Sequence, residues 1–300
     1  MAGRETARGG DRLPGVLAVD IGGTKLAAAV VTSDGSIVRR DRIPTPAREP
    51  WSALSALVRR IHASAGDIEL IACGAACGGP MSPNGEFVSP LHIPSWSDFP
   101  LRASLAEVTG LPAYVDNDAK ALALAEGWLG AASDVRDFIA VVVGTGVGAG
   151  IVSGGRLIGG RLGNAGHIGH VIVEPDGRQC RCGARGCLEA YLAGYAIEVE
   201  TGRGAAYANR SLVERNGRYL GRALAGVAAL CDIRRAVVCG GVAEGWGDPF
   251  LEAANVEFGQ RSRLVFTKGF DIVPAGLGGN AALVGAAAVA VSRHRRPSVG

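Results

Sequence analysis

The sequence predicts an α/β protein built from two similar lobes that face each other across a cleft. A pattern of strand, glycine-rich turn, strand, turn and strand begins at Leu17 and recurs at Phe138, which indicates an internal duplication. The composition agrees, because 46 glycines and 48% hydrophobic residues are typical of alanine-rich helices joined by glycine-rich turns. A chain of 300 residues is also long enough to bury one or two sizeable cores.

In the first repeat, a strand at 17–19 turns through 20–25 and returns at 26–31. Asp34-Gly35 then predicts a hairpin turn into a third strand at 37–43. A helix at 51–65 and a strand at 68–75 follow, and a short strand at 113–115 leads into a helix that runs to Leu129.

In the second repeat, strands are expected at 138–143 and 149–153, joined by a glycine-rich turn at 144–148. The remaining elements are a strand that starts at 156–158, an apolar strand at 236–239 and an alanine-rich closing helix at 280–293. We therefore expect a disordered N-terminal arm at 1–15, a small N-terminal lobe at 16–117 joined by the 280–293 helix, and a large lobe at 118–279.

Charge and hydropathy exclude several classes of partner. The 31 basic and 28 acidic residues are spread along the chain and form no basic stripe, so we expect no nucleic-acid partner. The N-terminal segment lacks the apolar core of a signal peptide. The longest nearly apolar run, 281–291, is shorter than the roughly 20 residues of a membrane span. We expect a cytoplasmic protein with no membrane partner.

The two glycine-rich turns predict a nucleotide site. Glycines let backbone N–H groups approach phosphate oxygens, and Asp20 at a strand end can hold a hydrated Mg²⁺ ion. The first turn is not a Walker loop, because its spacing differs and a strand follows it. The alternative is an ordinary hairpin with a buried aspartate, but a second turn at 144–148 favours phosphate binding from both walls of a cleft. The candidate ATP-binding residues are Gly22, Gly23, Thr24, Lys25, Thr145, Gly146, Gly240 and Gly241.

Gly240-Gly241 follows the apolar strand at 236–239, where a purine or ribose can lie against the backbone. A plain strand-to-helix turn is the alternative reading of this pair. Asn117-Asp118 also stands at a strand end and starts a helix. Phosphoryl transfer to an alcohol needs a carboxylate near the attacking hydroxyl, and Asp118 can serve as this base. The alternative is a helix N-cap, and the two roles are compatible.

One histidine and three clustered cysteines predict a structural zinc site. His170 is followed by Cys180, Cys182 and Cys187 in a glycine-rich segment, and a Cys₃His set is a known tetrahedral Zn²⁺ complement. With four protein ligands the coordination is closed, so the expected role is structural. Reduced thiols or a disulfide are the alternatives, and a cytoplasmic setting disfavours the disulfide. The other cysteines lie in apolar segments and are expected to be buried: Cys73, Cys77, Cys231 and Cys239.

These motifs resemble those of the ROK family of sugar kinases and repressors, over roughly residues 16–291. The resemblance rests on the Asp20–Lys25 turn, Asn117-Asp118-Ala119, Gly144-Thr145-Gly146 and the segment from Gly169-His170 to Cys187-Leu188-Glu189. It implies the actin-like (ribonuclease H-like) ATPase fold, with two lobes that close over sugar and ATP, usually in a homodimer. The large lobe would carry the zinc loop and the dimer surface.

The resemblance also implies roles for individual residues. Asp118 would be the base for the 6-hydroxyl of a hexose, in a glucokinase-like reaction. Asn117, His170 and Glu189 would hold the sugar ring, and the backbone of Gly79 would contact it. His170 would link the metal to the substrate, because it is also a zinc ligand.

Two departures from the family pattern fall in the sugar pocket. His167 stands where glucose-type members usually carry Glu, and His92 stands where they usually carry Asn. A neutral imidazole donates one hydrogen bond and accepts one, whereas a carboxylate only accepts. A buried mismatch costs about 1–3 kcal/mol, enough to change the preferred sugar. Amino sugars, modified sugars and cyclitols are therefore alternative acceptors, and polyphosphate is an alternative donor.

Two further classes of function remain alternatives. A ROK-type repressor would carry a helix-turn-helix domain before the first glycine turn, and fewer than twenty residues precede Asp20. The retained phosphate motifs and Asp118 also favour catalysis. A sugar-binding subunit without catalytic activity would bind sugar without turnover.

Overall fold

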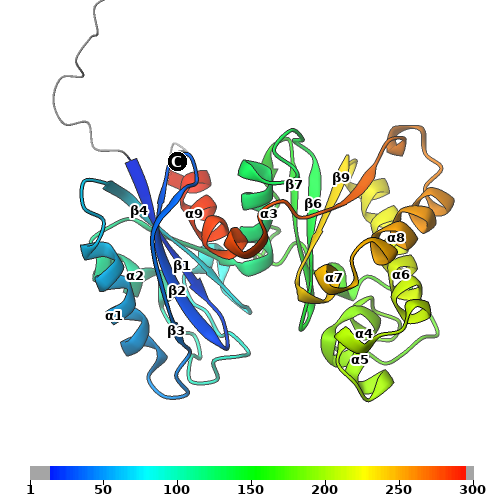
Figure 1. Ribbon diagram of the computed structural model, residues 1–300, viewed down its shortest axis with the longest axis horizontal. Coiled ribbons are helices and arrows are strands. Elements are labelled where there is room, and N and C mark those ends of the chain that lie inside the picture. The colour runs from blue at the N-terminus through cyan, green and yellow to red at the C-terminus, as the bar shows by residue number, and fades with distance from the viewer. Residues whose placement is uncertain (1–13, 295–300) are drawn as a thin grey trace, which may run out of the picture.

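Two five-stranded sheets of the same topology form the protein (Figure 1). The computed structural model describes residues 14–294, so most of the predicted N-terminal arm lies outside the described residues, and residues 14 and 15 already belong to the first strand. The first sheet has the order β3-β2-β1-β4-β5, and the second has the matching order β8-β7-β6-β9-β10. The strands are β1 (Pro14–Ile21), β2 (Lys25–Thr32), β3 (Ile37–Pro44), β4 (Glu69–Cys77), β5 (Ala113–Asn117), β6 (Phe138–Val143), β7 (Val147–Ser153), β8 (Arg156–Leu157), β9 (Arg235–Cys239) and β10 (Asp271–Pro274).

The strand pairing confirms the predicted duplication. In each sheet three strands form an antiparallel meander, β1-β2-β3 and β6-β7-β8, and two further strands extend it in parallel, β4-β5 and β9-β10. Single strands differ by a few residues at their ends from the ranges expected above, and β8 is only two residues long. The actin-like, two-sheet α/β fold class is therefore correct.

Two helices lie between the sheets and connect them (Figure 1). The closing helix α9 (Ala281–His294) packs on β1, β4 and β5, and α3 (Asp118–Leu129) packs on α9 and on β6 and β7. The approach of α9 to the sheet is close because small residues meet there. A Cβ atom built on Gly74 of β4 would lie 2.0 Å from the carbonyl oxygen of Ala286 in α9.

The remaining helices cover the outer faces. α1 (Pro50–Ala63) and α2 (Leu101–Thr109) bury apolar residues against the first sheet, and α6 (Arg210–Cys231) and α8 (Asp248–Arg261) do so against the second. The short helices α4 (Glu189–Leu192), α5 (Gly194–Thr201) and α7 (Gly241–Trp246) lie beside the second sheet (Figure 1). Single 3₁₀ turns occur at 83–85, 168–170, 205–207, 265–267 and 278–280. Within residues 14–294, none of the helices is both long and apolar enough to cross a bilayer.

Candidate active site and metal centre

The carboxyl ends of three neighbouring strands bring the first group of candidate residues to one edge of the first sheet. β1, β4 and β5 run parallel, so their ends meet at the same edge. The register places Ile21 of β1 beside Cys77 of β4, and Cys77 beside Asn117 of β5. Ile21, Cys77 and Asn117 thus lie in one row across the sheet. Asp20 directly precedes Ile21 and Asp118 directly follows Asn117, so both carboxylates belong to the same edge.

The Asp20 carboxyl is buried, and the positive charge of Lys25 offsets only part of the cost of burying its negative charge. Burial raises its pKa from 3.8 to about 6, the ammonium group of Lys25 opposes this rise, and the carboxylate of Asp118 adds to it. Lys25 Nζ lies 4.0 Å from Asp20 Oδ2 and is half exposed. Asp20 is thus an acidic group in a place that disfavours negative charge, and a cation arriving at this point would be bound favourably.

Asp118 begins α3, and the residue is exposed to solvent although many protein atoms surround its carboxyl group. This burial raises the pKa of Asp118, while the N–H of Ala119 and the nearby His92 oppose the rise. The Ala119 N–H donates to Asp118 Oδ1 at 2.8 Å and to Asn117 Oδ1 at 3.0 Å. Asn117 therefore caps the helix, as the alternative reading predicted, and the cap holds Asp118 in place.

The first glycine hairpin joins β1 to β2 at this edge. Gly22 N–H donates to the Lys25 carbonyl at 3.0 Å, which closes the turn. The turn lies against the segment that carries His92, because a Cβ atom on Gly23 would lie 2.4 Å from His92 Cβ. Gly23, Thr24 and Lys25 are exposed. Across the edge, a Cβ atom on Gly79 would lie 3.9 Å from Asn117 Nδ2, so Gly79 lies beside the cap.

The second glycine hairpin joins β6 to β7 and also lies close to Asp118. Glycines on β7 let the first turn of α3 pack directly on this strand: a Cβ atom on Gly148 would lie 3.3 Å from Ala119 Cβ, and one on Gly150 would lie 3.0 Å from Lys120 Cα. The N-terminus of α3 is therefore held between the sheet edge of the first repeat and β7 of the second. Thr145 and Gly146 lie in the hairpin that begins β7, with Thr145 exposed.

Gly240 lies beside the second hairpin. It ends β9 with φ of +97°, and a Cβ atom there would lie 2.5 Å from the carbonyl oxygen of Val143, so only glycine fits without strain. Gly241 follows as the exposed first residue of α7. Gly240 lies beside the second hairpin because β9 pairs with β6 as far as Cys239 and Val142, and a plain strand-to-helix turn would give the same contact.

The predicted sugar-binding residues of the second repeat gather on the other side of β7. A Cβ atom on Gly169 would lie 2.4 Å from the Val147 carbonyl oxygen and 3.3 Å from Glu189 Cβ, so the histidine segment packs on both. The rings of His167 and His170 lie 6.1 Å apart. Burial lowers the pKa of His167. The nearby His170 and Lys120 lower this pKa further, whereas the Glu189 carboxylate opposes the change. His167 is therefore neutral near pH 7, with one ring nitrogen as donor and one as acceptor.

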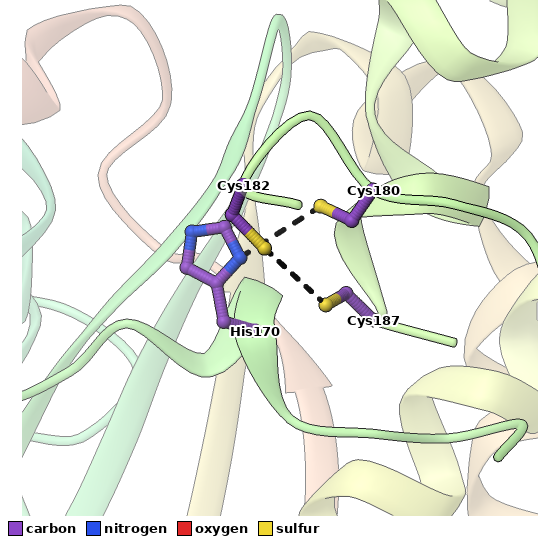
Figure 2. Close-up of side chains that lie close together, drawn as sticks. All are labelled: His170, Cys180, Cys182 and Cys187. Carbon is purple, nitrogen blue, oxygen red and sulfur yellow. Dashed lines mark hydrogen bonds between the residues drawn. The ribbon is translucent and has the colours of Figure 1, made fainter. Parts of the chain in front are cut away.

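The four predicted zinc ligands converge (Figure 2). The ligand atoms of His170, Cys180, Cys182 and Cys187 all lie within 4.8 Å of one another. Cys182 Sγ lies 3.7 Å from Cys187 Sγ, and Cys180 Sγ lies 3.9 Å from His170 Nδ1. A tetrahedral Zn²⁺ ion with sulfur ligands at about 2.3 Å separates neighbouring sulfurs by about 3.8 Å, so the donor set fits this metal in type and spacing.

Of the four other cysteines, Cys73, Cys77 and Cys239 are buried as expected. Cys231, at the end of α6, is half-buried, because the last turn of this helix reaches solvent.

Sequence reasoning missed several residues that support the site. Tyr195 donates its O–H to Glu189 Oε1 at 3.3 Å. Lys120, assigned no role above, is buried and donates to the carbonyl oxygens of Gly159, at 3.2 Å, and Gly163. Arg293 of α9 pairs with the buried carboxylate of Asp116. The contacts of Lys120 and Arg293 join residues far apart in the sequence, and Tyr195 and Glu189 lie on two different short helices, so no local pattern could reveal them.

Comparisons with known proteins agree with this geometry. The family described as "ROK family" matches residues 16–293. An N-acetylmannosamine kinase of Escherichia fergusonii is 38% identical over 252 residues, which cover 77% of this chain and 84% of the relative.

Two solved structures are also similar. The ROK hexokinase of Thermus thermophilus is 33% identical with a TM-score of 0.80, covering 92% of this chain and 97% of that one. A ROK family glucokinase of Streptomyces griseus, in complex with glucose and AMPPNP, is 30% identical with a TM-score of 0.73, covering 91% and 98%.

Proposed function

Since this chain belongs to the ROK family, we propose that it is an ATP-dependent sugar kinase that phosphorylates the 6-hydroxyl of a hexose or an amino sugar. The observation that carries this proposal is the position of Asp118 at the N-terminus of α3, between the edge that bears the first glycine hairpin and the strand that follows the second. A base at this point can meet a hydroxyl while backbone N–H groups of both hairpins hold the phosphates of the donor.

In the proposed reaction, the 6-hydroxyl gives its proton to the Asp118 carboxylate as its oxygen attacks the γ-phosphorus, and ADP leaves. The raised pKa of Asp118 makes this carboxylate a stronger base than an ordinary aspartate. Asn117, His170 and Glu189 would hold the sugar ring, together with the backbone of Gly79. Mg²⁺ bound with the nucleotide, held near Asp20 through water, would neutralise charge on the phosphates.

We favour an amino sugar over glucose as the acceptor. The curated relative at 38% identity is an N-acetylmannosamine kinase, which supports this choice. His167 supports it as well, because an imidazole N–H can donate to the carbonyl oxygen of an acetamido group, whereas the carboxylate of the usual Glu cannot. A coupled ADP assay over glucose, mannose, N-acetylmannosamine, N-acetylglucosamine and a cyclitol tests this proposal. A kcat/KM for glucose equal to or above that for the acetamido sugars would contradict it.

The variant Asp118→Asn tests the base. Loss of a general base lowers kcat by about 10²–10⁴-fold, while sugar affinity should change little. The matched control is Asp34→Asn, because Asp34 lies in the exposed β2–β3 turn and its contacts with Thr32 and Ser36 suit an amide as well. Wild-type turnover in Asp118→Asn would remove Asp118 from the reaction. Sugar binding without ADP release by the wild type would favour a sugar-binding subunit without catalytic activity, or a repressor.

We also propose that the zinc loop and the surface of the large lobe, 118–279, serve a homodimer in the cytoplasm. Exposed apolar residues in this lobe support such a contact, among them Val256, Val265 and Phe266, whose exposed fractions are 61%, 78% and 53%. Light scattering of the purified protein should give twice the mass of one chain. A mass of one chain at micromolar concentration would contradict the dimer.

A further inference from the structure

Glu189 is held at both of its carboxylate oxygens. Oε2 accepts the N–H of Val147 at 3.1 Å, next to the second glycine hairpin, and Oε1 accepts the O–H of Tyr195 at 3.3 Å. The two donors come from different elements, Val147 from β7 and Tyr195 from α5. With both oxygens held, the carboxylate keeps a single orientation and retains a lone pair on each oxygen for a sugar hydroxyl.

Tyr195 is itself held by the segment 180–187, which carries the three clustered cysteines and is the metal loop of this site. The guanidinium carbon of Arg181 lies 3.6 Å from the centre of the Tyr195 ring, well inside the roughly 6 Å limit for a cation–π contact. Arg181 stands between Cys180 and Cys182, two of the converging cysteines (Figure 2). The position of Arg181 therefore depends on the conformation of the Cys-Arg-Cys segment, which the four-residue cluster fixes.

We propose that Tyr195 is a positioning residue for the sugar site, and that Arg181 connects it to the metal loop. The chain of contacts runs from the Cys-Arg-Cys segment through the Arg181 guanidinium and the Tyr195 ring to the Glu189 carboxylate. This inference rests on the proposed function, because Glu189 is there a sugar-binding residue. It adds, beside His170, a second connection between the metal loop and the sugar site: the loop sets the orientation of a substrate-binding carboxylate.

Steady-state kinetics of Tyr195→Phe test the inference. The variant keeps the ring under Arg181 and loses only the hydroxyl donor, so the KM for the sugar should rise about 5- to 10-fold. The KM for ATP, the zinc content and the melting temperature should stay at their wild-type values. A role in folding alone would lower the melting temperature and leave the KM for the sugar unchanged, and that result would overturn the inference.

Arg181→Ala should raise the KM for the sugar by a similar factor, and the double variant should be little worse than Tyr195→Phe alone, because the two residues act in one chain. Arg185→Ala is the matched control. Arg185 lies in the same loop and binds the Gly177 carbonyl, at 3.2 Å, so its removal should leave the KM for the sugar unchanged. Full additivity of Arg181→Ala and Tyr195→Phe would contradict the connection through the ring.

A crystal structure of Tyr195→Phe separates this inference from the proposed function. If the wild type releases no ADP with any sugar, the proposed function fails. The crystal structure would still show whether the Tyr195 hydroxyl orients the Glu189 carboxylate. The expected result is a Glu189 carboxylate that rotates away from its position in the wild type, with the zinc loop unchanged. A Glu189 side chain with an unaltered orientation would overturn the positioning role.

Discussion

Asp20→Asn should stabilise the ligand-free protein at neutral and alkaline pH. The folded protein raises the pKa of Asp20 from 3.8 to about 6, so it binds this proton more tightly than the unfolded chain does. Ionisation of Asp20 therefore destabilises the fold as the pH rises from about 4 through 6. The shift of roughly two pKa units corresponds to about 3 kcal/mol at pH 8 and to about 0.5 kcal/mol at pH 4. Asparagine has the same size and avoids this cost.

Thermal unfolding of both proteins in buffer without nucleotide or Mg²⁺, at pH 4 to 8, measures the effect. At pH 8 the variant should melt about 5 °C or more above the wild type, and the difference should shrink as the pH falls. Asp41→Asn is the control, because Arg60 lowers the pKa of the partly exposed Asp41 carboxyl and the sign is opposite. Equal pH profiles of Asp20→Asn and wild type would refute the reasoning that burial of an uncompensated carboxylate limits stability here.

Two further predictions concern the metal and the packing of α9. Elemental analysis should find about one zinc ion per chain. Cys182→Ser should lose the zinc and the sugar affinity, whereas Cys231→Ser, outside the cluster, should retain both. A metal-free preparation with full activity would contradict the zinc site. Gly74→Ala should destabilise the protein by about 1–3 kcal/mol in denaturant unfolding, because the new Cβ would lie 2.0 Å from the Ala286 carbonyl oxygen. Gly226→Ala is the control, because Gly226 lies on α6 and the new Cβ would have no neighbouring atom within 4 Å. It should stabilise the protein by about 0.5–1 kcal/mol. Equal effects of the two substitutions would rule out the clash.

The sequence predicted most of the elements that carry the site, because strand ends and glycine turns are local patterns. The strand at Phe138–Val143 was predicted at its observed bounds, and Asp118 starts its helix as expected. α6 was not predicted, since three glycines interrupt its pattern. Two of them have a tertiary reason: a Cβ atom on Gly217 or Gly221 would lie 2.4 Å from a backbone carbonyl oxygen of α8, so these glycines let the two helices pack closely. Such a reason becomes visible only when the second helix is in place.

The roles assigned to site residues depend in the same way on contacts that the sequence does not encode locally. Tyr195 lies six positions after Glu189, and no helical spacing relates them, because α4 and α5 are distinct helices joined at Ala193. Asp116 similarly finds its partner, Arg293, at the far end of the chain. Residue types and strand ends could therefore predict the candidate base, the glycine turns and the candidate metal ligands, whereas their supporting contacts required the fold.

The duplicated architecture is symmetric in its backbone and asymmetric in its charge. The last pairs of the first hairpin are Asp20 with Ala27 and Ile21 with Leu26, and those of the second are Val142 with Gly148 and Val143 with Val147. Val142 thus occupies the position that corresponds to Asp20. The first repeat supplies both carboxylates at this edge, Asp20 and Asp118. The surrounding protein raises the pKa of each. Under the proposed function, a nucleotide that carries a cation would relieve this cost at Asp20, whereas the second hairpin would offer backbone N–H groups and the exposed hydroxyl of Thr145 to phosphate. In the proposed reaction both hairpins would contact the phosphates of the donor, and the two carboxylates, which serve the cation and the reacting hydroxyl, would both come from the first repeat.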